Sequence, residues 1–171
     1  MVIRAIWAMM LVIWGIAMAG AADAPPLVHT GVVEAPLDDV WGAFTTTAGI
    51  KSWMVPHADI ELKVGGKMRT HYDKNGTLGD ENSIENTILS FDPKRMLSIK
   101  ATKAPKNFPF KKSIEGMWTV IYFEAMGAKQ TKLTIVGLGF CDDEESQKLR
   151  RHFDAGNAYT LKKLQKRFAA K

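Results

Sequence analysis

The sequence predicts an α+β domain in which a curved antiparallel sheet of about seven strands and two short helices is closed by one long C-terminal helix. Strand-length segments with alternating apolar and polar residues are separated by glycine, proline and asparagine turns. A helical stripe of apolar residues then runs from Leu149 to Phe168. A curved sheet closed by one helix tends to enclose an apolar pocket. A binding cavity is therefore the first functional hypothesis.

The N-terminus predicts export. An apolar run follows Arg4, and small residues between Ala19 and Ala24 fit the small-x-small rule for signal cleavage. We expect residues 1–24 to be a signal peptide and residues 25–171 to be one folded domain, either periplasmic or secreted. The alternative is an uncleaved N-terminal anchor, because an apolar stretch of about 18 residues is at the lower limit for spanning a bilayer.

The first half of the domain predicts strands around two short helices. Val40, Trp41 and Phe44 lie at helical spacing, and Gly65 with Gly66 supplies the positive φ that a tight hairpin needs. In chain order, the expected elements are a strand at 27–34, helices at 37–45 and 48–53, and strands at 57–64 and 67–73.

The second half predicts two hairpins and the long helix. The expected strands are at 83–91, 96–102, 117–125 and 132–140, with a polar loop at 77–82 and a loop rich in lysine and proline at 103–113. Asp142 is the expected N-cap of the last helix. Glu145 then stands in the capping-box position, and acidic residues in the first turn suit the helix dipole.

The charge distribution and the cysteine count exclude nucleic acid as a partner and an intramolecular disulfide. The formal net charge is +5, and it stays +5 without the signal peptide, because the segment removes one arginine and one aspartate. The excess basic residues gather in the last helix, which favours a solvated helix face and leaves peripheral contact with an anionic membrane open. Interleaved aromatic residues at the spacing typical of nucleic-acid-binding proteins are missing, and the expected compartment also argues against nucleic acid, so no nucleic acid is expected. The single cysteine, Cys141, cannot form an intramolecular disulfide.

Several short motifs occur in a characteristic order. They are residues 40–45 (VWGAFT), 50–53 (IKSW), 62–66 (LKVGG), 91–97 (FDPKRML), 131–134 (TKLT) and 153–157 (FDAGN). Over residues 28–168 the chain resembles the START-like (SRPBCC) superfamily with its helix-grip fold, closest to the branch named after the heat-shock-protein ATPase activators. The resemblance implies an apolar ligand between sheet and helix, and a minority of members are cyclases or other enzymes. The family shares no catalytic residue, and Met68 stands where an aromatic is usual.

Large apolar side chains on loops, with inward polar residues, suggest the ligand site. Four large apolar residues lie on loops or a short helix, where fewer apolar side chains are needed to form the core: Trp53, Met54, Phe108 and Phe110. We expect them at a pocket rim or as loop anchors. Asn86, between apolar neighbours, could bind a ligand or satisfy a backbone group. The predicted ligand-binding residues are Trp53, Met54, Met68, Tyr72, Asn86, Phe108, Phe110, Trp118, Phe153, Asn157 and Leu161.

Catalytic candidates are weak. His71 and Asp73 could form a base and its orienting carboxylate, but alternation puts them opposite Met68 and Tyr72, which favours a surface position for both. The four histidines lack metal-ligand spacing, so neither a metal nor a cofactor is expected. Two functions stay open: a carrier of a lipid, isoprenoid or polyketide-like molecule, and a cyclase or hydratase acting on a similar substrate. The protein is expected to be a monomer or a weak dimer.

Overall fold

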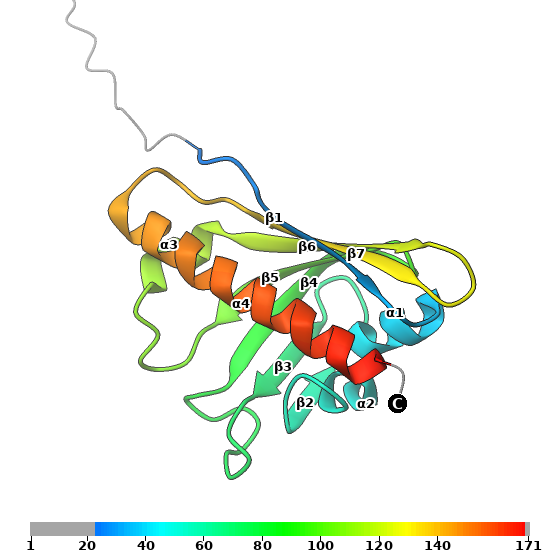
Figure 1. Cartoon of the computed structure of the whole chain (residues 1–171). Coiled ribbons are helices and arrows are strands. Elements are labelled where there is room, and N and C mark those ends of the chain that lie inside the picture. The colour runs from blue at the N-terminus through cyan, green and yellow to red at the C-terminus, as the bar shows by residue number, and fades with distance from the viewer. Residues whose placement is uncertain (1–22, 170–171) are drawn as a thin grey trace, which may run out of the picture.

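The computed structural model describes residues 23–169 and consists of a seven-stranded antiparallel sheet with one long helix lying across it (Figure 1). The predicted α+β helix-grip architecture is confirmed. The elements are β1 (Leu27–Val33), α1 (Leu37–Thr45), α2 (Thr47–Lys51), β2 (His57–Ile60), β3 (Lys67–His71), β4 (Ile84–Asp92), β5 (Met96–Lys103), α3 (Lys111–Gly116), β6 (Trp118–Ala125), β7 (Thr131–Leu138) and α4 (Glu144–Phe168). The predicted signal peptide lies almost wholly outside the described residues.

The sheet joins the two ends of the domain. Its strand order is β1-β7-β6-β5-β4-β3-β2, so the first strand pairs with the last one, from Leu27 opposite Gly137 to Val33 opposite Thr131. The pairing of β4 with β5 has register shifts at Glu85/Asn86 and between Ile88 and Ser90. Such irregularities bend a strand and increase its twist. They therefore help the sheet to curve beneath α4.

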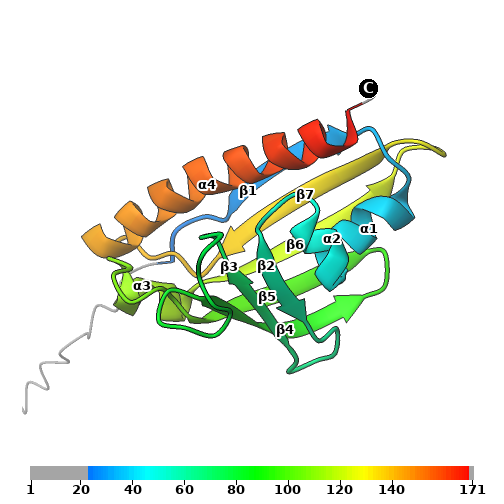
Figure 2. The same ribbon diagram turned by 90° about the horizontal axis from the view of Figure 1, so that it is seen from below.

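Helix α4 is fastened to the edge strand β1. Figure 2 shows α4 running alongside β1, with α1 and α2 covering the sheet beyond it. A Cβ atom added at Gly31 would lie 2.7 Å from Leu161 Cδ2, so a larger residue here would displace the Leu161 side chain. Gln165 Nε2 donates a hydrogen bond to the Val32 carbonyl at 2.9 Å. The helix is thus held close to β1 by shape as well as by hydrogen bonding.

Buried apolar side chains form two clusters at opposite ends of α4. The larger one includes residues of α1, α2 and the sheet, and it receives Leu161 and Leu164 from α4. The smaller one includes Leu27, Met117 and Phe140, and it receives Leu149. Neither cluster contains a fully buried residue from the middle of α4. This part of the helix lies over a space that the two clusters do not fill.

The N-cap of α4 is one residue later than predicted. Asp143, not Asp142, caps the helix, and its carboxylate accepts a hydrogen bond from Ser146 N at 3.0 Å. Glu145 does not close a capping box, because its Oε1 accepts from Ser113 N at 3.1 Å. The acidic run thus caps one helix and ties α3 to it.

Two local predictions are corrected. The segment predicted as a loop before β6 contains α3, whose Ile114 is buried against the smaller cluster. The strand predicted at 57–64 ends at Ile60, because the chain turns before the two glycines. Gly65 has φ 77°, and a Cβ on Gly66 would lie 2.1 Å from the Glu61 carbonyl oxygen. The single Cys141 is free and half-buried.

Among residues 23–169, no helix has the length and apolar content needed to cross a membrane. The possible anchor between residues 5 and 22 lies outside this range. Peripheral contact of the basic α4 with an anionic membrane stays a prediction.

Asp143→Ala should destabilise the domain by about 1 kcal/mol, because the free N–H group of Ser146 loses its acceptor. Asp142→Ala, which removes the adjacent acidic side chain, is the matched control and should change the free energy of unfolding much less. Urea unfolding of both variants measures the difference. Equal losses would contradict the assignment of the cap.

Candidate functional site

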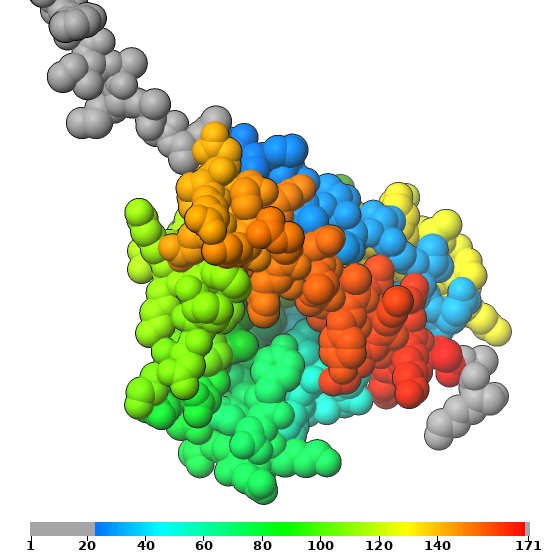
Figure 3. Space-filling view, turned by 60° about the vertical axis from the view of Figure 1, so that its left-hand side comes forward, coloured from blue at the N-terminus to red at the C-terminus, as the bar shows by residue number. Residues whose placement is uncertain are grey.

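A cavity of about 480 Å³ lies between the middle of α4 and the sheet. Figure 3 shows a hollow on the surface bordered by α4 in orange, by the segment after β5 in yellow-green and by the region around the end of β3 in green. Its lining residues come from nearly every element, namely Phe44, Ile50, Met54, Met68, Thr70, Tyr72, Ile84, Asn86, Ile99, Ala101, Lys103, Ala104, Pro105, Phe108, Ile114, Thr119, Ile121, Ile135, His152, Phe153, Gly156, Asn157 and Thr160. The cavity occupies the space between the two core clusters.

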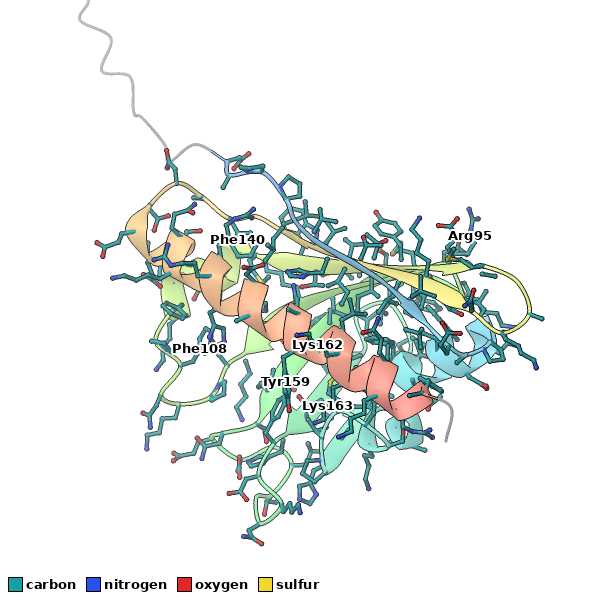
Figure 4. All side chains as sticks on the ribbon, viewed as in Figure 1. Arg95, Phe108, Phe140, Tyr159, Lys162 and Lys163 are labelled. Carbon is teal, nitrogen blue, oxygen red and sulfur yellow. The ribbon has the colours of Figure 1, made fainter. Side chains whose placement is uncertain are left out.

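The mouth of the cavity lies between α4 and the loops that follow β3 and β5. Tyr72 is 61% exposed, and His152 and Gly156 are exposed on the facing side of α4. Phe108 packs edge-on against His152, with ring centroids 5.7 Å apart. Figure 4 shows Phe108 and Tyr159 on the opposite side of α4 from β1. The cavity therefore opens on the side of the helix that is not fastened to the sheet edge.

Few polar groups face this apolar space. Thr70, Asn86 and Thr119 contribute them from the sheet, and Asn157 and Thr160 contribute them from α4. The Nδ2 atom of Asn157 is buried and has no hydrogen-bond partner among the described residues. Buried amide nitrogens are rarely left unpaired in proteins. This nitrogen is therefore the most distinctive polar feature of the cavity.

The cavity contains little charge. No aspartate or glutamate is among its described lining residues, and only Lys103 and His152 can carry a positive charge. The Lys103 ammonium donates hydrogen bonds to the carbonyls of Gly79, at 3.0 Å, and Asp80, at 2.5 Å. It therefore fixes the loop after β3 and is not free to pair with a ligand deep in the cavity.

Seven of the predicted ligand-binding residues line the cavity. They are Met54, Met68, Tyr72, Asn86, Phe108, Phe153 and Asn157. Met68 and Tyr72 lie on the same side of the chain, as alternation predicted. Asn157 lies four residues after Phe153 and so on the same face of α4. Their role in binding stays a prediction.

The sequence suggested that Trp53 and Leu161 line the cavity, but in the structure neither residue does. Trp53 is buried in the larger core cluster, where its indole N–H donates to the Ala43 carbonyl at 3.0 Å and its ring packs edge-on against Phe44. Leu161 fills the space over Gly31. Both side chains bind elements of the fold to one another.

Phe110 and Trp118 also lie outside the lining. Phe110 packs against the smaller core cluster and stacks edge-on with Phe108 at 5.5 Å. On β6, Thr119 and Ile121 face the cavity, so alternation turns Trp118 to the other face of the sheet. The sequence is apolar on both faces of this strand, so it does not show which residues face the cavity.

The surface position predicted for His71 is wrong. His71 is only 4% exposed and lies outside the cavity, beneath the loop that follows β3. A Cβ on Gly76 would lie 1.9 Å from the imidazole Cε1, so the loop backbone covers the ring closely. His71 Nδ1 accepts from Asp73 N at 3.1 Å, and Nε2 lies 3.1 Å from Asp80 Oδ1. The carboxylate beside the imidazole therefore belongs to Asp80 and not to Asp73.

Asp80 organises this loop. Burial alone would raise the pKa of its carboxyl, but hydrogen bonds from the backbone N–H groups of Asn82 and Thr77 act in the opposite direction. The neighbouring His71 and the Ser83 hydroxyl lower the pKa further, so that it lies below the ordinary value of 3.8. The ionised carboxylate is thus the form that the folded loop stabilises.

Among the polar lining residues, the sequence reasoning missed Thr70, Thr119, Thr160, Lys103 and His152. Thr119 lies on the same face of β6 as Ile121, which would have been a usable signal once the phase of the strand was known. Lys103 and His152 carry no local signal, because only the folded loop and the helix orientation bring them to the mouth. No group of three or more histidine, cysteine, aspartate or glutamate residues suited to a metal ion is found within residues 23–169.

A curved sheet that holds one helix over an apolar cavity defines a helix-grip protein of the START-like superfamily. The chain belongs to the family described as activator of Hsp90 ATPase homolog 1-like protein, whose model matches residues 34–169. No curated protein gives a significant match.

Solved structures show the same fold at low sequence identity. The Aha1 dimer of Colwellia psychrerythraea is 18% identical with a TM-score of 0.64, and the match covers 85% of this chain and 96% of that one. Protein MLL2253 of Mesorhizobium loti is 17% identical with a TM-score of 0.64, covering 84% of this chain and 96% of that one. DynU16, from the dynemicin biosynthetic locus, is 18% identical with a TM-score of 0.60, covering 82% of this chain and 46% of that one.

Phe153→Ala should destabilise the protein by only about 1–2 kcal/mol, because the side chain borders open space and loses fewer contacts than a fully packed residue. Leu149→Ala is the matched control on the same helix. Leu149 is fully buried in the smaller cluster, and its truncation should cost ~2–5 kcal/mol. Chemical denaturation measures both, and a larger loss for Phe153 would contradict its assignment to the cavity wall.

Asp80→Asn should lower the stability of the protein at neutral pH. Because the pKa of Asp80 is lowered by folding, its stabilising contribution is present above the ordinary value of 3.8 and is lost as the pH falls through the lowered value. The difference in unfolding free energy between wild type and variant should therefore shrink on acidification. A difference that stays constant from neutral to acidic pH would show that the charge is not responsible.

Proposed function

We propose that this protein is an exported carrier that binds one small, mainly apolar molecule in the cavity under α4 and releases it unchanged. The observation that carries this proposal is the cavity itself, whose volume of about 480 Å³ falls within the range of small-molecule sites. Its lining is dominated by aliphatic, aromatic and methionine side chains, and methionine adapts readily to ligands of different shape.

The chemistry of the lining favours carriage over catalysis. General acid–base catalysis needs a titratable group within hydrogen-bond reach of the reacting atoms. The described lining has no carboxylate, and its one imidazole, His152, is exposed and packs between the rings of Phe108 and Phe153. The pair formed by the buried His71 and the partly exposed Asp80 lies outside the lining. A cyclase or hydratase on this chain would need a different set of groups.

Export and self-association are supported by features other than the cavity. The apolar N-terminal segment and its small-residue sites support export to the periplasm or beyond. The Aha1 structure of Colwellia psychrerythraea is a dimer, which supports a weak dimer as the alternative to a monomer for this chain.

Export predicts that material from the cell envelope starts between Gly20 and Pro25 when its N-terminus is sequenced. The reason is that the small residues before these positions fit the specificity of signal peptidase. A chain that keeps Met1 and is recovered from the soluble cytoplasm would contradict the proposal.

Gly156→Phe should weaken ligand binding at least about ten-fold without loss of stability, because a Cβ at this mouth position meets open space and glycine is a poor helix former. Titration with the neutral fluorophore N-phenylnaphthylamine measures binding, and thermal unfolding measures stability. Ala155→Phe is the matched control, since Ala155 is an exposed neighbour on α4 outside the lining. If both variants bind the probe like the wild type, the cavity is not its site.

A further inference from the structure

We propose that Asn157 and Asn86 form a hydrogen-bonding subsite within the cavity and that the natural ligand is an uncharged apolar molecule bearing a carbonyl or similar acceptor oxygen. Fatty acids and other carboxylates are excluded from this class. The inference rests on the proposed function, because it concerns the ligand of the same cavity.

The first observation is the unpaired amide of Asn157. Its Nδ2 is buried without a hydrogen-bond partner, and the residue lines the cavity from the middle of α4. Elsewhere on the inner side of this helix, Leu149, Leu161 and Leu164 provide apolar packing. A leucine would serve equally well here if packing were the only demand. An amide that cannot pair within the protein is explained when a ligand oxygen accepts its hydrogen.

The second observation is an amide on the opposite wall. Asn86 lines the cavity from β4, where its cross-strand neighbours Met68 and Ala101 are apolar and also line the cavity. A register shift lies between Glu85 and Asn86. Bulges of this kind occur next to binding sites, where they redirect a side chain. The helix and the sheet thus each contribute one amide to a largely apolar space.

The third observation is that, among the described lining residues, no charged side chain is free to neutralise an ionised group deep in the cavity. Lys103 is held by the carbonyls of the loop after β3, and His152 lies at the exposed mouth among aromatic rings. An ionised carboxylate buried without a partner is strongly disfavoured. The absence of carboxylates from the described lining equally disfavours a cationic ligand. The cavity therefore matches neutral polar groups.

Three fluorescent probes that share one ring system and chain length test this inference, namely hexylpyrene, methyl pyrenehexanoate and pyrenehexanoic acid. The wild-type protein should bind the neutral ester at least about ten-fold more tightly than either the hydrocarbon or the acid. Asn157→Leu should remove the preference for the ester over the hydrocarbon while hydrocarbon binding is kept, and Asn86→Leu should reduce that preference. Ala155→Leu, on the outer side of α4, should leave all three affinities unchanged.

Stability gives an independent readout. Without ligand, Asn157→Leu should raise the thermal midpoint by ~2–4 °C, because it removes an unpaired buried amide. A lower midpoint would mean that the amide serves the fold, and it would overturn the inference.

The outcomes separate the two proposals. Saturable binding without preference for the ester, or a preference that survives Asn157→Leu, would overturn the amide subsite and leave the carrier function intact. Failure of all three probes to bind would overturn the carrier function and the subsite with it.

Discussion

The architecture depends on how α4 is attached, because the helix is packed tightly at both ends and loosely in the middle. Leu149 is buried at one end, and Leu161 and Leu164 are buried at the other, where Gly31 lets the helix approach β1. These contacts carry the hydrophobic stabilisation of the helix, which scales with the apolar area removed from water. The domain can therefore fold without side chains that fill the cavity under the middle of the helix.

The curvature of the sheet completes the site. Pairing of β1 with β7 fixes one edge, and the irregular pairing of β4 with β5 bends the sheet on the other side of the cavity. The loop after β3 closes over His71 and is tied down by Lys103 and by the ionised Asp80. The titratable groups of this loop thus act on the shape of the mouth, while the space beneath the helix stays nearly free of charge. This separation favours a binding role over acid–base chemistry.

The fold followed from the sequence because periodicity records which faces are buried. Strand-length segments bounded by turn residues predicted the seven strands, and the stripe on the last helix contained both its core residues and the cavity residues Phe153 and Asn157. What failed were distinctions that periodicity cannot make. Trp53 is equally apolar in a core or in a pocket, and both faces of the strand around Trp118 are apolar. Alternation put His71 on the face opposite Met68 and Tyr72 and so favoured the surface, and no pattern shows that a polar loop will fold over it. Helix α3 is too short to show a period.

Native mass spectrometry of the protein purified from the envelope of its own cells tests the central claim most directly. The account predicts a population that carries one neutral, mainly apolar compound small enough for a cavity of about 480 Å³ and that loses it intact on gentle activation. Gly156→Phe purified in the same way should lack the adduct, and Ala155→Phe should keep it. Recovery of the wild type without any bound compound, or with one that both variants retain equally, would contradict the account.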